Sequence, residues 1–361
     1  MNSAAGTETV INGKKYLYFA GTGYFQLNSH PDLNKAASEA TLKYGISSST
    51  SRAITGTTPL ILEIEKKIAE YFDTEDAAYL PSGYLSNIAG LEALDKMNAF
   101  DIIFIDEDSH YCNIEGAEVV GKPVIRFKHR SVEDLEFKLS NNLKLNEKPL
   151  IVSDGLFPVW GNPAPLDGYL ELAENYDGLI WIDDAHGVGI LGQNGRGTYE
   201  HLGLKSERLF MGATLSKAFG AYGGIIPGNA DFIKHVRSGS VMHGSTSPMN
   251  AAVAAGIKGI ELVNDNPEMR LKLWENARYL KAGIKSLGID SDNNCLPIVA
   301  FTLGDSETMI RMHEALMDKG IYIQYSKYRG SGNDGVLRIV VFSTHTKAQI
   351  DFLIDSLKKI L

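Results

Sequence analysis

Cysteine is scarce in this sequence, with only Cys112 and Cys295 among 361 residues. Two cysteines in unrelated contexts provide neither a disulfide framework nor the paired spacing of a zinc site, and they fit a reducing compartment. Long apolar runs are also missing, because none approaches the roughly 20 residues that span a bilayer. Residues 1–19 lack the basic start and apolar core of a signal peptide. We therefore expect a soluble, cytoplasmic protein with no membrane partner.

Basic charge is not in excess either, since 35 lysines and arginines face 44 acidic residues and give a formal net charge of −9. This balance disfavours nucleic acid as the main partner. It leaves a small anionic ligand open, because a pocket can be locally positive on an acidic protein. The composition is otherwise that of a globular protein, with 44% hydrophobic and 22% charged residues.

The length and the residue pattern predict an α/β protein with more than one domain. We expect an N-terminal hairpin and helix over residues 1–43, a large domain over 44–263 and a small C-terminal α/β domain over 264–361. Apolar runs alternate with helical stretches in the large domain, which is typical of a mainly parallel, seven-stranded sheet between helices. The seven runs are "AAYLP", "DIIFID", "PVIRF", "LIVSDG", "LIWIDD", "LFMGAT" and "GGIIPG".

Polar residues follow several of these runs, at the strand ends where parallel sheets bind ligands. Ser82 and Gly83 open a helix whose free backbone N–H groups suit a phosphate, although serine is also a common helix cap. His110 suits stacking on a planar ring or proton transfer, and a structural histidine is the alternative. Asp183 suits holding a proton on a heteroaromatic nitrogen or binding a metal.

Lys217 lies among small and apolar residues in "GATLSKAFGAYGG", with the hydroxyls of Thr214 and Ser216 nearby. A partly desolvated lysine has a lowered pKa and becomes a nucleophilic amine that forms an imine. Taken alone, Lys217 would more often be a surface lysine whose stem lies along apolar surface and whose amine reaches water. Together, an amine, a phosphate cradle, an acid and a stacking ring are what pyridoxal 5'-phosphate requires.

The stretch "WIDDAHGVGILGQNGRG", followed about 30 residues later by "GATLSKAFGAYGG", resembles the α-oxoamine synthase family of fold-type I pyridoxal-phosphate enzymes. The resemblance extends from "YLYFAGTGYFQL" to "LRIVVFSTHT", which is nearly the whole chain. It implies a fold-type I transferase that condenses an amino acid with an acyl-CoA or acyl-carrier thioester and releases carbon dioxide.

The resemblance also implies a role for each matching residue. Lys217 would form the Schiff base and act as the base at the substrate's α-carbon. Asp183 would pair with the pyridinium nitrogen, His186 would bond the phenolic oxygen and His110 would stack on the ring. The residues expected around the phosphate and cofactor are Ser82, Gly83, Tyr84, Thr214 and Ser216.

Two further matches concern the partner subunit and the substrate. The stretch "HGSTSPMN" resembles the segment that reaches the neighbouring subunit's phosphate, through Ser245 and Thr246, and so implies a homodimer with shared active sites. Arg338 in "VLRIVVF" matches the arginine that binds the substrate carboxylate, which suits a bidentate guanidinium donor.

Two rival interpretations fail on the residues themselves. The spacing from Gly187 to Gly192 matches the dinucleotide fingerprint G-x-G-x-x-G, but that fingerprint must open a helix at once. Here helical spacing resumes only at about Thr198. A metal hydrolase built from "DEDSH" and "DDAH" would explain neither Lys217 nor Arg338.

The departures from the family lie on the substrate side, whereas the cofactor side is intact. The tail reads "VVFSTH", and the N-terminus starts late, so a segment that walls the acyl-CoA entrance looks missing. The runner-up function is therefore an aminotransferase that acts on an amino acid and a keto acid, and a cofactor-binding scaffold without catalysis comes third. The departing positions are Thr22, Gly23, Thr58, Ile61, Pro158 and Trp160.

Overall fold

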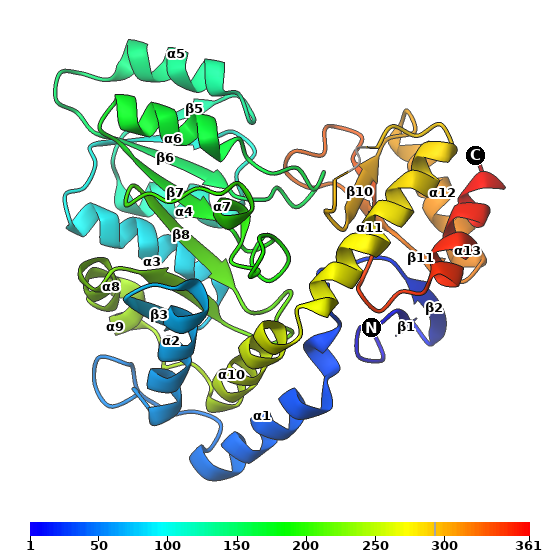
Figure 1. Ribbon diagram of the computed structural model, residues 1–361, viewed down its shortest axis with the longest axis horizontal. Coiled ribbons are helices and arrows are strands. Elements are labelled where there is room, and N and C mark those ends of the chain that lie inside the picture. Colours follow the sequence, from blue (N-terminus) through cyan, green and yellow to red (C-terminus); the bar gives the residue numbers. More distant parts are fainter. Residues whose placement is uncertain (292–293) are drawn as a thin grey trace.

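The computed structural model of the protein describes residues 1–291 and 294–361. Its larger part is built on a seven-stranded sheet with the order β3-β9-β8-β7-β6-β4-β5 (Figure 1). Only β9 runs antiparallel to its neighbours, so the mainly parallel sheet predicted from the apolar runs is confirmed. The strands are β3 (Asp76–Leu80), β4 (Ile102–Asp106), β5 (Val124–Phe127), β6 (Pro149–Asp154), β7 (Leu179–Asp183), β8 (Leu209–Thr214) and β9 (Gly224–Gly228).

Adjacent side chains of each strand pack into different cores, because successive residues of a strand point to opposite faces. In β4, Ile102 and Phe104 belong to one core, and Ile103 and Ile105 belong to the other. Helices close both cores, as expected for a buried parallel sheet. One face carries α3 (Gly83–Lys96), α4 (Tyr111–Val120), α8 (Ala230–Arg237) and α9 (Ser240–Gly244). The other carries α1 (Pro31–Tyr44), α2 (Pro59–Phe72), α5 (Val132–Asn142), α6 (Leu166–Asn175) and α10 (Asn250–Asp265).

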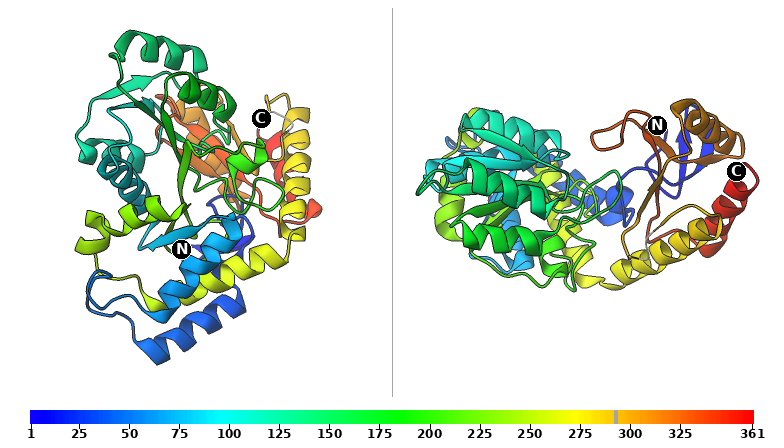
Figure 2. Two further views of the ribbon diagram at one scale, coloured as in Figure 1. Left: turned by 60° about the vertical axis from the view of Figure 1, so that its left-hand side comes forward. Right: turned by 90° about the horizontal axis from the view of Figure 1, so that it is seen from above.

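Two three-stranded sheets form the smaller part of the molecule, which Figure 2 shows to one side of the large sheet. The predicted N-terminal hairpin is present, and its second strand pairs with a C-terminal strand, so the two chain ends share one layer. The domain boundaries given above stay predictions. The elements are β1 (Glu8–Ile11), β2 (Lys14–Tyr18), η1 (Leu27–Ser29), α7 (Thr198–His201), α11 (Glu268–Ser286), β10 (Ile298–Phe301), α12 (Ser306–Asp318), β11 (Ile321–Tyr322), β12 (Gln324–Ser326), β13 (Val336–Val340) and α13 (Lys347–Lys358).

A long helix, α11, leads from the large part into the small one and is fixed there by a buried amide. Asn276 is fully buried, and its Nδ2 donates to the carbonyl oxygens of Phe342, Ser343 and His345 at 2.9, 3.2 and 2.9 Å. These carbonyls belong to the segment that follows β13, and β13 itself contains Arg338. Within the described residues, no helix has the length and apolarity that a membrane crossing requires.

We expect Asn276→Ala to lower the free energy of unfolding by about 2 kcal/mol, because three buried carbonyls lose their donor. Asn264→Ala is the matched control, since Asn264 is exposed on α10 and, among the described residues, its amide bonds only to the neighbouring Asp265. Alanine is the better helix former, so this control gains a few tenths of a kcal/mol. Urea unfolding followed by circular dichroism measures both variants. Equal midpoints would contradict the role given to Asn276.

Candidate active site

The polar residues that follow β4, β7 and β8 meet at one edge of the large sheet. These strands are all parallel to their shared neighbours, so their carboxyl ends face the same side. His110 follows β4, Asp183 ends β7 and Lys217 follows β8. The sequence therefore predicted the convergence of these three residues correctly.

Asp183 is a buried carboxylate with several hydrogen-bond donors around it. Its side chain is 7% exposed. Oδ1 accepts from the backbone N–H of Ala185 at 3.0 Å, and Oδ2 accepts from Nδ2 of Asn87 at 2.9 Å and from the thiol of Cys112 at 3.2 Å. These donors fix the orientation of both carboxylate oxygens, which suits a partner for a cationic ring nitrogen.

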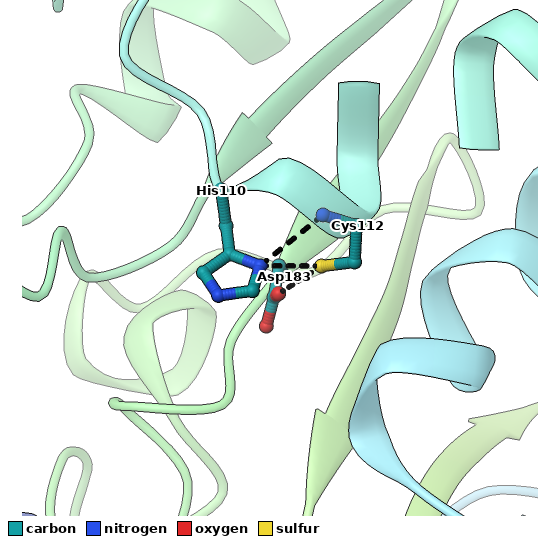
Figure 3. A group of neighbouring side chains, drawn as sticks. All are labelled: His110, Cys112 and Asp183. Carbon is teal, nitrogen blue, oxygen red and sulfur yellow. Dashed lines mark hydrogen bonds between the residues drawn. The ribbon is translucent and has the colours of Figure 1, made fainter. Parts of the chain in front are cut away.

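His110 caps the start of α4 and lies beside Asp183, as Figure 3 shows. Its backbone N–H donates to Oδ1 of Asp154 at 2.9 Å, and its Nδ1 lies 2.8 Å from Sγ of Cys112. Ligand atoms of His110, Cys112 and Asp183 all lie within 4.8 Å of one another, a spacing that metal sites also show. Hydrogen bonds account for this spacing, and burial lowers the pKa of His110, so its imidazole is neutral at pH 7.

Lys217 is half-buried, and no ion pair within the described residues involves its amine. Burial lowers the pKa of Lys217, and the carboxylates of Asp183 and Asp154 oppose that shift only in part. The amine therefore loses its proton more readily than a surface lysine does, which is what a nucleophilic amine needs. The expectation of a desolvated lysine is consistent with this geometry.

Asp154 ends β6 next to Asp183 and was not among the predicted site residues. Burial and the charge of Asp183 raise its pKa well above the usual range. Its Oδ1 accepts from the backbone of His110 and from Nδ2 of Asn113 at 3.1 Å. Its function is thus to fix the start of α4, and with it the position of the His110 ring.

Asp184 points away from the site and organises the glycine-rich loop that follows β7. It accepts hydrogen bonds from both the N–H and the hydroxyl of Thr198 at 2.6 Å, and burial raises its pKa to about 7. A Cβ at Gly187 or Gly197 would come within 2.1 or 2.0 Å of its carboxylate. The glycines are required by this close packing, and α7 begins only at Thr198, so rejecting the dinucleotide fingerprint was right.

The start of α3 forms a backbone cradle against β8. Ser82 is the N-cap, and its hydroxyl accepts from the N–H of Leu85 at 3.3 Å. A Cβ at Gly83 would lie 2.6 Å from Cβ of Thr214, so glycine alone allows this approach. Oγ1 of Thr214 lies 2.9 Å from Oγ of Ser216. Free N–H groups, a helix dipole and two hydroxyls fit a phosphate group.

His186 and Arg338 are linked through Tyr24, which comes from the N-terminal segment. The hydroxyl of Tyr24 lies 2.8 Å from Nδ1 of His186 and also bonds Arg338. Burial, with the cations of Lys217 and Arg338, lowers the pKa of His186 far below its usual value, so this ring is neutral. Arg338 is 6% exposed, and its Nε donates to the carbonyl of Pro158 at 2.7 Å.

The connection between β12 and β13 contacts the same edge from the smaller part of the molecule. Its Tyr328 ring lies 6.2 Å from the ring of His110. Nε of Arg329 donates to the carbonyl of Glu107 at 2.8 Å, and Nε1 of Trp160 donates to the carbonyl of Gly330 at 2.8 Å. The site is therefore bounded by both parts of the chain.

Ser245 and Thr246 were also predicted to bind the cofactor. No described interaction connects either residue to this cluster. Ser245 ends α9, where its hydroxyl donates to the carbonyl of Val241 at 2.5 Å. Thr246 is exposed and pairs with Ser51 in an isolated bridge. Their expected contact with a neighbouring subunit stays a prediction.

The sequence analysis missed Tyr24, Asn87, Cys112 and Asp154. Asp154 carried a usable signal, because it ends a strand as Asp183 does. Asn87 lies one helical turn after Gly83, on the face of α3 toward β7. The sequence does not show which face of the helix packs there, so Asn87 could not be predicted. Tyr24 is distant in sequence and carried no local signal.

Comparisons with known proteins show the family to which the chain belongs. The family model for aminotransferase class I and II matches residues 21–357. An 8-amino-7-oxononanoate synthase of Alkaliphilus oremlandii is 34% identical over 98% of this chain and 89% of the relative. The 8-amino-7-oxononanoate synthase 1 of Bacillus subtilis is 33% identical over 99% of this chain and 91% of the relative.

Solved structures match over the same length. A structure of serine palmitoyltransferase with PLP has a TM-score of 0.92 at 30% identity, and it covers 98% of this chain and 89% of its own. The serine palmitoyltransferase of Sphingomonas wittichii has a TM-score of 0.92 at 26% identity, with the same coverage. An 8-amino-7-oxononanoate synthase of Francisella tularensis, at 22% identity and a TM-score of 0.80, supports the fold.

The fold and the site together define a fold-type I transferase whose cofactor is pyridoxal phosphate. Within that class, the chain belongs to the α-oxoamine synthase family. The resemblance inferred from "WIDDAHG" and the lysine motif is thereby confirmed.

We expect Gly83→Ala to weaken the binding of pyridoxal phosphate at least tenfold, because the new methyl group would collide with Thr214 and shift the helix N-terminus. Fluorescence titration of the apoprotein measures the affinity, and circular dichroism shows that the variant is folded. An unchanged affinity would remove the start of α3 from the cofactor site.

Proposed function

We propose that the protein condenses an amino acid with an acyl thioester and releases carbon dioxide, as an 8-amino-7-oxononanoate synthase-like enzyme. The observation that carries the proposal is the placement of the Lys217 amine near two buried carboxylates, Asp183 and Asp154. The fit of the site to pyridoxal phosphate, and the names of the full-length relatives, support the same function. In this proposal, the residues on the substrate side of the site determine which acyl group and which amino acid are used.

When bound, pyridoxal phosphate supplies a ring that stabilises negative charge at the substrate's α-carbon. The amine of Lys217 would hold the cofactor covalently and afterwards accept the α-proton. Asp183 would hold the proton of the ring nitrogen, because its two oxygens are oriented by fixed donors. Burial keeps His186 neutral, so one ring nitrogen bonds Tyr24 and the other is free to bond the cofactor's hydroxyl.

Arg338 would bind the carboxylate of the amino acid. It is a buried cation, its described hydrogen-bond partners are neutral, and no carboxylate among the described residues forms an ion pair with it. A buried guanidinium without a counter-ion is costly, and an anionic substrate would offset that cost. The two backbone carbonyls of Pro158 and Gly21 fix its direction.

A homodimer with shared active sites is part of the proposal. Exposed apolar side chains occur on α1 and α2 and in the segments that lead into α2 and α10, and such exposure suits a protein–protein contact. Ser245 and Thr246 lie at the start of the last of these segments. Light scattering of the purified protein tests the dimer. The exposed apolar residues are Leu42, Ile46, Ile54, Leu62 and Met249.

An aminotransferase is the second candidate, because the matching family model is that of aminotransferase class I and II and the substrate side departs from the synthase pattern. Pro158, in particular, has no hydroxyl to offer. Release of coenzyme A from an amino acid and an acyl-CoA supports the synthase. Turnover of a keto acid without any thioester supports the aminotransferase.

We expect Lys217→Ala to abolish covalent attachment of the cofactor and to lower coenzyme A release by at least a thousandfold. Borohydride reduction followed by peptide mass spectrometry locates the attachment. The site can be assigned without ambiguity, because the nearest other lysine in the sequence is Lys205. Lys205→Ala is the matched control and keeps full activity. A trapped cofactor on any other lysine would refute the assignment of Lys217.

The pH dependence of cofactor attachment should follow the lowered pKa of Lys217. Only the unprotonated amine attacks an aldehyde, so the attachment rate rises with pH and levels off once the amine has lost its proton. We expect the midpoint of this rise to lie below the value of about 10.4 for a free lysine side chain. Rapid mixing with pyridoxal phosphate measures the rate, with N-acetyl-lysine as the reference. A midpoint at or above that reference would be inconsistent with a desolvated amine.

A further inference from the structure

Cys112 is the second residue of α4, and its thiol lies between two residues of the cofactor site (Figure 3). Sγ is 2.8 Å from Nδ1 of His110 and 3.2 Å from Oδ2 of Asp183. The side chain is 1% exposed. The function proposed above gives this buried thiol no role.

The surrounding hydrogen bonds fix the direction in which the thiol donates. Nε1 of Trp181 can only donate, and it bonds Oδ1 of Asn87 at 3.0 Å, so the NH2 group of Asn87 must face Asp183 and Cys112. Nδ2 of Asn87 lies 2.9 Å from Oδ2 of Asp183 and 3.2 Å from Sγ of Cys112. Sγ is one of three acceptors around that NH2 group, with Oδ2 of Asp183 and the carbonyl of Gly83. Because Nδ2 can only donate, the thiol proton is not directed at Asn87 and is free to be donated elsewhere.

The carboxylate of Asp183 is the acceptor for that proton. The backbone N–H of Cys112 donates to Nδ1 of His110 at 3.2 Å and so already uses the single lone pair of Nδ1. Burial, together with the charges of Asp183 and Asp154, raises the pKa of Cys112, so the thiol keeps its proton at neutral pH.

We propose that Cys112 is a positioning residue of the cofactor site, whose thiol links the carboxylate of Asp183 to the imidazole of His110 and weakens that carboxylate's hold on a ring-nitrogen proton. A hydrogen bond donated to a carboxylate stabilises its charged form and lowers its affinity for a proton. The same contact holds the His110 ring beside Asp183. This inference rests on the proposed role of Asp183.

The test compares Cys112→Ala with Cys112→Ser in the cofactor-loaded protein. Without the thiol, Asp183 attracts the ring proton more strongly, the ring withdraws electrons less, and the nitrogen joined to Lys217 keeps its proton to higher pH. We expect the pH midpoint of the bound cofactor's visible absorption change to rise by about half a unit or more in Cys112→Ala. Cys112→Ser should restore most of the wild-type midpoint, because a hydroxyl also donates.

Cys295→Ser is the matched control, because it alters the protein's other buried thiol, which belongs to the segment before β10. It should leave the midpoint unchanged. A Cys112→Ala protein that loses thermal stability but keeps the wild-type midpoint overturns the inference, and so does a Cys112→Ser protein that shifts as far as Cys112→Ala.

Asp183→Asn, measured in the same way, separates this inference from the proposed function. If Asp183→Asn shifts the midpoint and Cys112→Ala does not, only the role of Cys112 fails. If neither variant shifts it, the role of Asp183 fails as well, and the inference falls with it.

Discussion

The active site depends on the balance between burial and charge around the amine of Lys217. Burial disfavours the ammonium form, while the carboxylates of Asp183 and Asp154 favour it. If burial acted alone, the amine would have no neighbouring charge to orient it, and if the carboxylates dominated, it would stay protonated and unreactive. Burial prevails and lowers the pKa of Lys217, which gives a nucleophile without an adjacent general base.

The parallel sheet makes this balance possible because it delivers several side chains to one edge. Neighbouring residues at the end of β7 then take opposite directions. Asp183 faces the site, and Asp184 faces the glycine-rich loop, where Thr198 satisfies both of its oxygens. One short sequence thus places a buried carboxylate at the site and a second one that supports the loop, and the glycines of that loop serve close packing against Asp184.

The sequence allowed the strand-end residues to be predicted, because position after a parallel strand determines location. His110, Asp183 and Lys217 were found by this rule, and the whole seven-stranded sheet followed from the apolar runs. Tyr24 and Asn87 could not be found in the same way. Each reaches the site through tertiary packing, Tyr24 from the N-terminal segment and Asn87 from the buried face of a helix, and no local pattern encodes that contact.

Tertiary contacts also explain two of the departures from the family, Pro158 and Trp160. Pro158 removes a side-chain hydroxyl, yet its backbone carbonyl binds Nε of Arg338 and orients that guanidinium. Trp160, two residues later, holds the carbonyl of Gly330 and so fixes the connection that carries Tyr328 over His110. These substitutions therefore leave Arg338 oriented in the site and change the surface beside it. In the function proposed above, a change of that kind would alter which substrate fits the site and would leave the residues around the cofactor unchanged.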